Sequence, residues 1–124
     1  MTEIRLPFPP SVNDMYANNK GARGRGRYPS KEYEAWKDQA GWELNAQHVK
    51  PIDGVAEVRI DLDSTRRGDA DNRIKAVLDL LVSHKILRGD SKKYIRRVSA
   101  GWEAVAGCRV SIITDSPHME KPLA

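Results

Sequence analysis

The sequence predicts an α+β domain in which a small mixed β-sheet packs against two main helices. Two stretches carry apolar residues at helical spacing, and several shorter stretches alternate apolar with polar residues, as strands do. These stretches give the order strand, helix, strand, helix, strand, strand, which is typical of the α+β class. At 124 residues, the chain is long enough to bury one core, so we expect a single domain over residues 1–124.

The first strand is expected at residues 3–6, before the proline-rich segment 7–10 forms a rigid extended turn. Three glycines interleaved with arginines predict a flexible basic loop at residues 21–27. Ser30 is a suitable N-cap, and apolar residues follow it at helical spacing. We therefore expect a helix over residues 30–48.

In the second half of the chain, residues 57–62 alternate cleanly and predict a half-buried strand. An amphipathic helix is expected at residues 71–84, where apolar residues recur at i, i+3, i+4, i+7 and i+8. Two further strands are expected at residues 94–102 and 109–114. Residues 116–124 contain two prolines and are expected to form a frayed tail.

Charge is unevenly distributed along the chain. The net charge is +4 and the sequence pI is about 9.3, which favours a polyanionic partner. Residues 20–31 contain five basic residues and no acid, and residues 88–97 contain five basic residues and only Asp90 as an acid. Each cluster is either a solvated surface or a phosphate-binding surface, and charge alone does not decide between them.

Several classes of protein are excluded. Cys108 is the only cysteine, so the chain forms no internal disulfide and no multi-cysteine zinc cluster; we expect it to be a small buried side chain. The three histidines are far apart and lack ligand spacing. No apolar run approaches the roughly 20 residues of a membrane span, and the N-terminus lacks a signal-peptide pattern. We expect a cytoplasmic protein without a membrane partner.

Two aspartates one residue apart precede the second helix in the sequence GDADNRIKAVLDLL. In the structural alternative, Asp71 is the N-cap of the helix and Asp69 forms the turn beside a glycine. In the functional alternative, both carboxylates hold a metal ion. Lys75 lies one helical turn after Asp71, so an acid and an amine are expected to flank the same spot where strand meets helix.

The spacing of these acids excludes a calcium loop of the EF-hand type. Such a loop needs an oxygen ligand at its fifth position and glycine at its sixth, where this chain has Arg73 and Ile74. Magnesium needs only one or two carboxylates together with water and phosphate oxygens. We interpret Asp69 and Asp71 as its ligands, with Asp90, an isolated acid among cations, as the third.

This set of residues is typical of metal-assisted phosphodiester hydrolysis. The metal would polarise the phosphate and generate hydroxide, while Lys75 would offset charge in the transition state or on the leaving oxygen. Paired carboxylates also occur in glycosidases, but that reaction needs an aromatic-rich sugar cleft. With eight aromatic residues in the whole chain, nothing indicates such a cleft.

At these residues the sequence resembles the RusA family of Holliday junction resolvases, short endonucleases of bacteria and their prophages. The matching features are the proline-rich opening of residues 4–13, the acid pair Asp69 and Asp71 with Lys75, and Asp90 beyond the helix. The resemblance covers most of residues 4–114. It implies that the three aspartates bind metal, that Lys75 is the catalytic lysine, and that a homodimer cuts four-way junctions with magnesium. A two-fold dimer suits two opposed incisions.

Two positions depart from the family pattern. Family members often have paired aspartates where this chain has Gly89 and Asp90, so one supporting acid is missing. An aromatic residue that is thought to wedge into the junction in some members corresponds here to Leu78. Leucine can act as an apolar wedge, but Leu78 belongs to the apolar stripe of the helix, and we expect it to pack in the core.

The sequence therefore predicts a magnesium-dependent, structure-selective endonuclease that resolves Holliday junctions, with Mn²⁺ as a possible substitute and no organic cofactor. Two alternatives remain: a non-catalytic DNA-binding module in which the aspartates cap a helix, and a metal-dependent nuclease for flaps, forks or RNA. Charge and position predict that the following residues bind DNA phosphates: Arg23, Arg25, Arg27, Arg66, Arg67, Lys92, Lys93 and Arg96.

Overall fold

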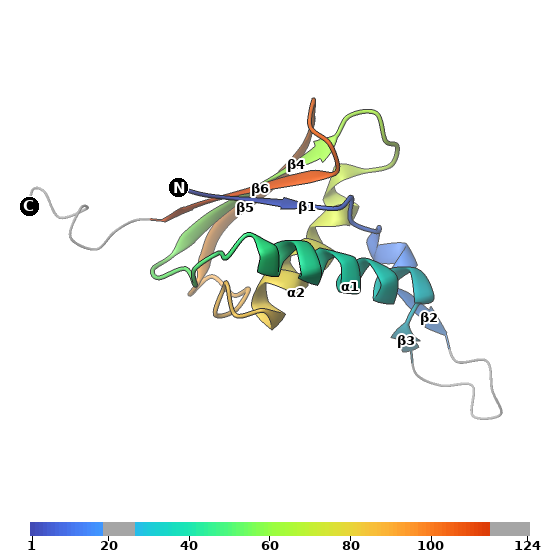
Figure 1. Cartoon of the computed structure of the whole chain (residues 1–124), viewed down its shortest axis with the longest axis horizontal. Coiled ribbons are helices and arrows are strands. Elements are labelled where there is room, and N and C mark those ends of the chain that lie inside the picture. The colour runs from blue at the N-terminus through green and yellow to red at the C-terminus, as the bar shows by residue number, and fades with distance from the viewer. Residues whose placement is uncertain (19–26, 115–124) are drawn as a thin grey trace, which may run out of the picture.

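The computed structural model describes residues 1–18 and 27–114. A four-stranded sheet with the order β1-β6-β4-β5 forms one layer of the molecule (Figure 1). The pair β4 and β5 is parallel and the other pairs are antiparallel, so the sheet is mixed, as the sequence predicts. The strands are β1 (Thr2–Leu6), β4 (Ala56–Asp63), β5 (Ile95–Glu103) and β6 (Cys108–Thr114).

Two helices cover one face of this sheet (Figure 1). Helix α1 (Lys31–Ala46) starts at Ser30, whose hydroxyl accepts a hydrogen bond from the Tyr33 amide at 3.1 Å, so the expected cap is confirmed. Helix α2 (Ile74–Ser83) connects the parallel strands β4 and β5. The two helices approach closely because Gly41 of α1 leaves room for the His84 ring.

The core lies between the sheet and the helices. Every second residue of β4 is buried, and the same alternation in β6 matches it, because Leu62 pairs with Cys108 and Ile60 with Val110. Cys108 is fully buried, as expected. Helix α2 contributes the apolar stripe that the sequence indicates; its buried residues are Ala76, Val77, Leu80 and Leu81.

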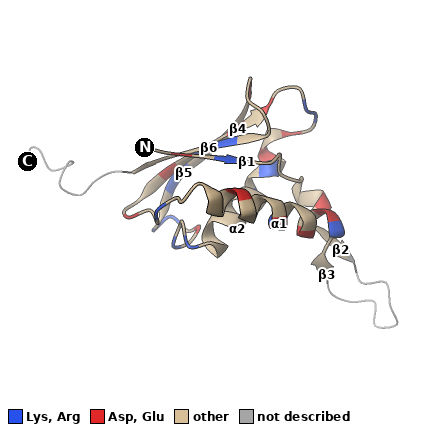
Figure 2. Cartoon of the chain, viewed as in Figure 1, with Lys and Arg blue, Asp and Glu red and all other residues tan. Residues whose placement is uncertain are grey.

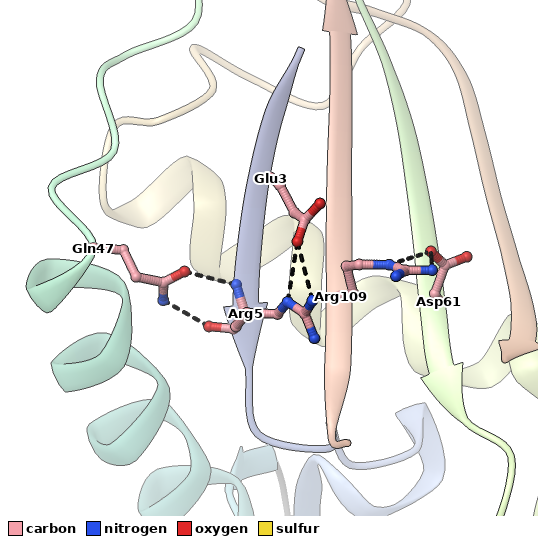
Figure 3. A network of polar contacts seen from close by, with 5 residues as sticks. All are labelled: Glu3, Arg5, Gln47, Asp61 and Arg109. Atoms are coloured by element: carbon pink, nitrogen blue, oxygen red, sulfur yellow. Dashed lines mark hydrogen bonds and ion pairs between the residues drawn. The ribbon is translucent and has the colours of Figure 1, made fainter. Parts of the chain in front are cut away.

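The opposite face of the sheet is polar, and several of its charges form ion pairs (Figure 3). Arg109 contacts Asp61 at 2.9 Å across β6 and β4, and Arg5 contacts Glu3 at 3.1 Å along β1. The carboxamide of Gln47, just after α1, bonds both the amide and the carbonyl of Arg5 at 2.7 Å. This side chain occupies the outer edge of β1.

Three features differ from the sequence-based expectation. A short ribbon, β2 (Tyr16–Asn18) paired with β3 (Arg27–Pro29), precedes α1 and was not expected. The expected helix at 71–84 instead begins with a 3₁₀ turn, η2 (Ala70–Arg73), before α2. A second 3₁₀ turn, η1 (Val12–Asp14), follows the proline-rich segment. The tail 116–124 lies outside the described residues.

In the part of the chain that the structure describes, no helix has the length and apolar character needed to cross a bilayer.

Candidate metal and DNA site

The acid pair lies on η2, between the carboxyl end of β4 and the start of α2. Asp69 is the N-cap residue of η2, and Asp71 lies within the turn. Both side chains are exposed. Among the described residues, neither carboxylate has a hydrogen bond or an ion pair. The structure thus presents two free carboxylates, whose oxygens are ligands that magnesium prefers.

The expected helix cap at Asp71 is wrong. The N-cap of η2 is Asp69, which makes no side-chain capping bond, and α2 begins after Arg73, also without one. The 3₁₀ turn is the reason: Asp71 lies inside η2, after its N-cap residue, and a cap must have non-helical backbone. The structural alternative, in which the pair caps a helix, loses its geometric basis.

The loop between β4 and η2 carries two arginines of the predicted DNA surface. It follows Asp63, the last residue of β4, whose carboxylate accepts hydrogen bonds from the Thr65 hydroxyl at 2.7 Å and the Thr65 amide at 3.0 Å. These bonds lower the pKa of Asp63 below its usual value. Beyond this turn, Arg66 and Arg67 are exposed. We call residues 64–68 the arginine loop.

Arg73 holds the arginine loop, η2 and the proline-rich segment together. Its guanidinium donates to the Pro9 carbonyl at 2.9 Å and to the Arg67 carbonyl at 3.3 Å. Phe8 packs against both Arg66 and Arg73, with 4.3 Å and 4.8 Å from its ring centroid to the two guanidinium carbons. The acid pair is therefore attached to a segment more than 60 residues earlier in the chain.

Gly68 makes this arrangement possible. Its φ is +117°, and a Cβ atom there would lie 2.7 Å from the Arg73 guanidinium. Glycine adopts this backbone conformation readily, while other residues rarely do. Gly68 therefore lets the chain turn closely around Arg73 directly before Asp69.

Lys75 does not lie beside Asp71 as its spacing predicts, but pairs with a different acid. Its ammonium lies 3.4 Å from the Asp79 carboxylate, one turn further along α2, and among the described residues it has no ion pair with Asp71. The Lys75 side chain is half exposed, at 51%, so the pair is weak and can exchange with solvent.

Asp79 also affects a residue of α1. Burial, and next the charge of Asp79, raises the pKa of Tyr33 on α1 to about 12.

Asp90 lies at the other end of α2. It is exposed in the turn between α2 and β5, and this turn lies beside the amino end of β4, because the Ala56 amide donates to the Tyr94 carbonyl. The ten residues of α2 span about 15 Å, with η2 adding to that length. Accordingly, no cluster of three acidic, histidine or cysteine side chains that could hold a metal occurs within residues 1–18 and 27–114.

The remaining predicted DNA-binding residues lie in three places. Lys92, Lys93 and Arg96 are exposed around the turn between α2 and β5, where Figure 2 shows Lys and Arg in blue. Arg96 also contacts Glu57 at 3.5 Å. Arg23 and Arg25 lie outside the described residues, and Arg27 begins β3. Leu78 packs against the core, as expected.

Sequence reasoning missed Phe8, Gly68 and Arg73 as organisers of the site. Arg73 follows an acid pair at the start of a helix, where a charged side chain is usually solvated, and no local pattern marks its contact with Pro9. The glycine before Asp69 predicts a turn, but not the close approach to Arg73 that requires it. For Gly68 and Arg73, closeness in sequence to the acid pair was the only feature that could have indicated a role in the site.

Exposed carboxylates and arginines lie together on a basic α+β domain, and such a surface suits an enzyme that acts on nucleic acids. The family model for the endodeoxyribonuclease RusA matches residues 7–113, which is most of the chain. The chain therefore belongs to the RusA family of endodeoxyribonucleases, which resolve Holliday junctions. A comparison with curated protein sequences gave no match.

Proposed function

We propose that this protein is a magnesium-dependent endonuclease that resolves Holliday junctions by paired symmetric incisions. The observation that carries the proposal is the acid pair. Asp69 and Asp71 are exposed one residue apart, without a partner among the described residues, directly after a loop with two exposed arginines. Carboxylates left free beside cations are suited to a divalent ion that approaches together with phosphate.

Each residue of the site has a role that follows from its position. Asp69 and Asp71 would hold magnesium, or manganese in its place. A divalent cation bound there supplies polarisation of the phosphate and a more acidic water as the nucleophile. Lys75 leaves its exposed pair with Asp79 and donates to the leaving oxygen or to the phosphate, where negative charge grows in the transition state.

Asp90 completes this site only if a second copy of the chain supplies it. Within one copy, α2 separates Asp90 from the acid pair. Strand β5 is an outer strand of the sheet, and η2 lies against it. In a two-fold dimer with the β5 edges antiparallel, the amino end of one β5 meets the carboxyl end of the other. Asp90 of one copy would then lie near the acid pair of its partner.

This homodimer also suits the substrate. A two-fold dimer carries two sites related by the same symmetry as the two strands to be cut in a four-way junction. The exposed Arg66 and Arg67 lie beside the acid pair, and Lys92 and Lys93 beside Asp90. In the proposed dimer both basic surfaces flank each site, where they would bind the phosphates that enter it.

Cleavage of an end-labelled synthetic four-way junction tests the proposal, beside linear duplex, flap and fork, with magnesium or EDTA. We expect symmetric paired nicks in the junction alone. EDTA should abolish them, and Asp71→Asn should reduce their rate by at least about 100-fold while junction binding persists. Asp38→Asn, an exposed carboxylate change on α1, is the matched control and should cut normally.

The same experiment separates the alternatives. Binding of the junction without cutting under any metal would make the protein a non-catalytic DNA-binding module. Cutting of flaps or forks in preference to the junction would keep the roles of Asp69 and Asp71 and change the substrate.

A further inference from the structure

A pocket beside the acid pair contains Arg66 and Arg67, and the function proposed above leaves its other lining residues unused. Its volume is about 560 Å³, within the range of about 300–1,000 Å³ typical of small-ligand sites. Its walls come from α1, the arginine loop and the proline-rich segment, with Asp14 of η1 and Arg73 of η2. The proline-rich segment lies between the other two, because Pro7 accepts from the Trp36 indole at 3.0 Å and Pro9 accepts from Arg73 at 2.9 Å.

The pocket is lined by both basic and acidic side chains, and these do not form ion pairs with one another. Arg66, Arg67 and Arg73 line it together with Asp14 and Glu32. Among the described residues no ion pair joins these arginines to these acids, and neither Arg67 nor Glu32 has any side-chain hydrogen bond or ion pair. The Asp14 carboxylate already accepts from the Ser11 hydroxyl at 3.0 Å. A ligand that uses both sets of charges would carry an anionic group for the arginines and hydrogen-bond donors for the carboxylates.

A nucleotide has both groups. Its phosphate pairs with arginine, and the exocyclic amino group of adenine, cytosine or guanine donates to a carboxylate. In duplex DNA one hydrogen of the amino group stays free in a groove, but the base is stacked between its neighbours. Only an unpaired, unstacked nucleotide can therefore place its base inside a pocket. Thymine lacks the amino group and satisfies the carboxylates less well.

The position of the pocket agrees with this ligand. Arg67 lines the pocket and precedes Asp69 of the acid pair by two residues. A nucleotide held there would lie beside the phosphodiester that the acid pair would act on.

We propose that this pocket binds a single unpaired DNA nucleotide, with its phosphate on Arg66 and Arg67 and its amino-bearing base on Glu32 and Asp14. The proposal rests on the nuclease function proposed above and adds a second binding site to it. Binding there would retain one strand beside the cut and favour bases that carry an amino group.

Titration of the full-length protein with deoxynucleoside monophosphates, followed by amide shifts in NMR spectra, tests the pocket without any cleavage. We expect dAMP, dCMP and dGMP to shift pocket amides and to bind about tenfold more tightly than dTMP. Glu32→Gln should reduce this preference to about twofold or less, because the neutral amide accepts more weakly than the carboxylate. Asp38→Asn should behave as the wild type.

A second variant tests the pocket by filling it with a large side chain. Ala35 is exposed on α1 and lines the pocket, so Ala35→Phe should abolish the shifts from every nucleotide. Ala46→Phe, an exposed alanine on the same helix outside this pocket, is the matched control and should retain them. Equal binding of all four nucleotides to the wild type, or shifts that persist in Ala35→Phe, would overturn the proposal.

Junction cleavage by the same proteins separates this proposal from the nuclease function. If the wild type cuts junctions and no monophosphate shifts the pocket amides, the pocket proposal alone is wrong. If the monophosphates bind with the expected preference and no strand is cut under any metal, the nuclease proposal fails and the pocket proposal stands.

Discussion

Gly68 and Arg73 form a contact in which each residue constrains the other. The φ of Gly68 is +117°, and the space its missing Cβ leaves is occupied by the Arg73 guanidinium. Arg73 has no freedom to move away, because its two terminal nitrogens donate to Pro9 and Arg67. Its Nε is buried without a hydrogen-bond partner in the described structure, which costs free energy.

Gly68→Ala should therefore destabilise the protein. We expect the free energy of unfolding to fall by about 1–3 kcal/mol, from backbone strain and from the 2.7 Å approach to Arg73. Gly101→Ala is the control, because a Cβ at Gly101 meets nothing within 4 Å. Urea unfolding measures both; an equal effect of the two substitutions would contradict the steric explanation.

Cys108 makes stability depend on pH in alkaline solution. Burial raises the pKa of its thiol from 9.0 to about 12. The unfolded chain therefore loses this proton above about pH 9 while the folded chain keeps it, so the free energy of unfolding falls as pH rises from about 9 towards 12. Tyr33, with a pKa also raised to about 12, adds to this fall above pH 10.

Between pH 8.5 and 10, the wild type should lose about 1 kcal/mol more stability than Cys108→Ala, which lacks the thiol. Urea unfolding of both proteins at three pH values in this interval measures the difference. Parallel loss in both proteins would show that the thiol ionises equally in the folded and unfolded states.

At the scale of elements, the outer edge of β1 is closed by a side chain. Exposed strand edges invite pairing with other chains, and β1 lies at one edge of the sheet. Gln47 pairs with the amide and the carbonyl of Arg5 as a neighbouring strand would, and its amide nitrogen also donates to the Glu43 carbonyl at 2.7 Å. The Gln47 side chain thus closes the edge of β1 and bonds a backbone carbonyl in the last turn of α1.

Gln47→Ala should lower the free energy of unfolding by about 1–2 kcal/mol, the effect of losing these hydrogen bonds. It should also accelerate hydrogen exchange of the Arg5 amide. Gln39→Ala, whose side chain bonds only the exposed Glu43 carboxylate, is the control and should change stability by less than about 0.5 kcal/mol. Unchanged exchange at Arg5 would show that the sheet alone protects this edge.

The 3₁₀ turn before α2 changes the relative positions of Asp71 and Lys75. In a regular α-helix from residue 71, Asp71 and Lys75 would lie on neighbouring positions one turn apart. The 3₁₀ turn of η2 winds more tightly, with three residues per turn. Asp71 and Lys75 are therefore displaced from that spacing, and Lys75 pairs forward with Asp79 inside α2.

At the scale of the whole molecule, the predicted metal ligands are divided between the two ends of α2. The arrangement proposed above places Asp71 of one copy and Asp90 of the other in one site. It predicts that mutations at these positions complement each other between subunits, because a heterodimer of Asp71→Asn and Asp90→Asn retains one site with both acids intact.

Heterodimers purified with two different tags should nick the junction on one strand, while both mutant homodimers stay inactive. Light scattering should show a dimer for all three proteins. If the heterodimer is as inactive as the homodimers, each site takes its acids from one chain. If Asp90→Asn cuts as the wild type does, Asp90 is not a ligand.

Most of the fold was predictable because its determinants are local. Alternation marked β4, helical spacing marked α1 and α2, and Ser30 marked the start of α1. The acid pair was found in the same way, as two aspartates at the junction of a strand and a helix. The β2 and β3 ribbon was missed because three residues are too few for a periodic pattern.

By itself the sequence determined the α+β class, the elements of the sheet and helices, and the candidate acids, because periodicity and residue type express them over a few neighbouring positions. Only the tertiary structure decided what surrounds those acids. Arg73 meets Pro9 across 64 residues of sequence, and Gln47 meets Arg5 across 42. Such contacts depend on how the elements pack, which no local pattern encodes. The separation of Asp90 from the acid pair likewise follows from the parallel pairing of β4 and β5 across α2.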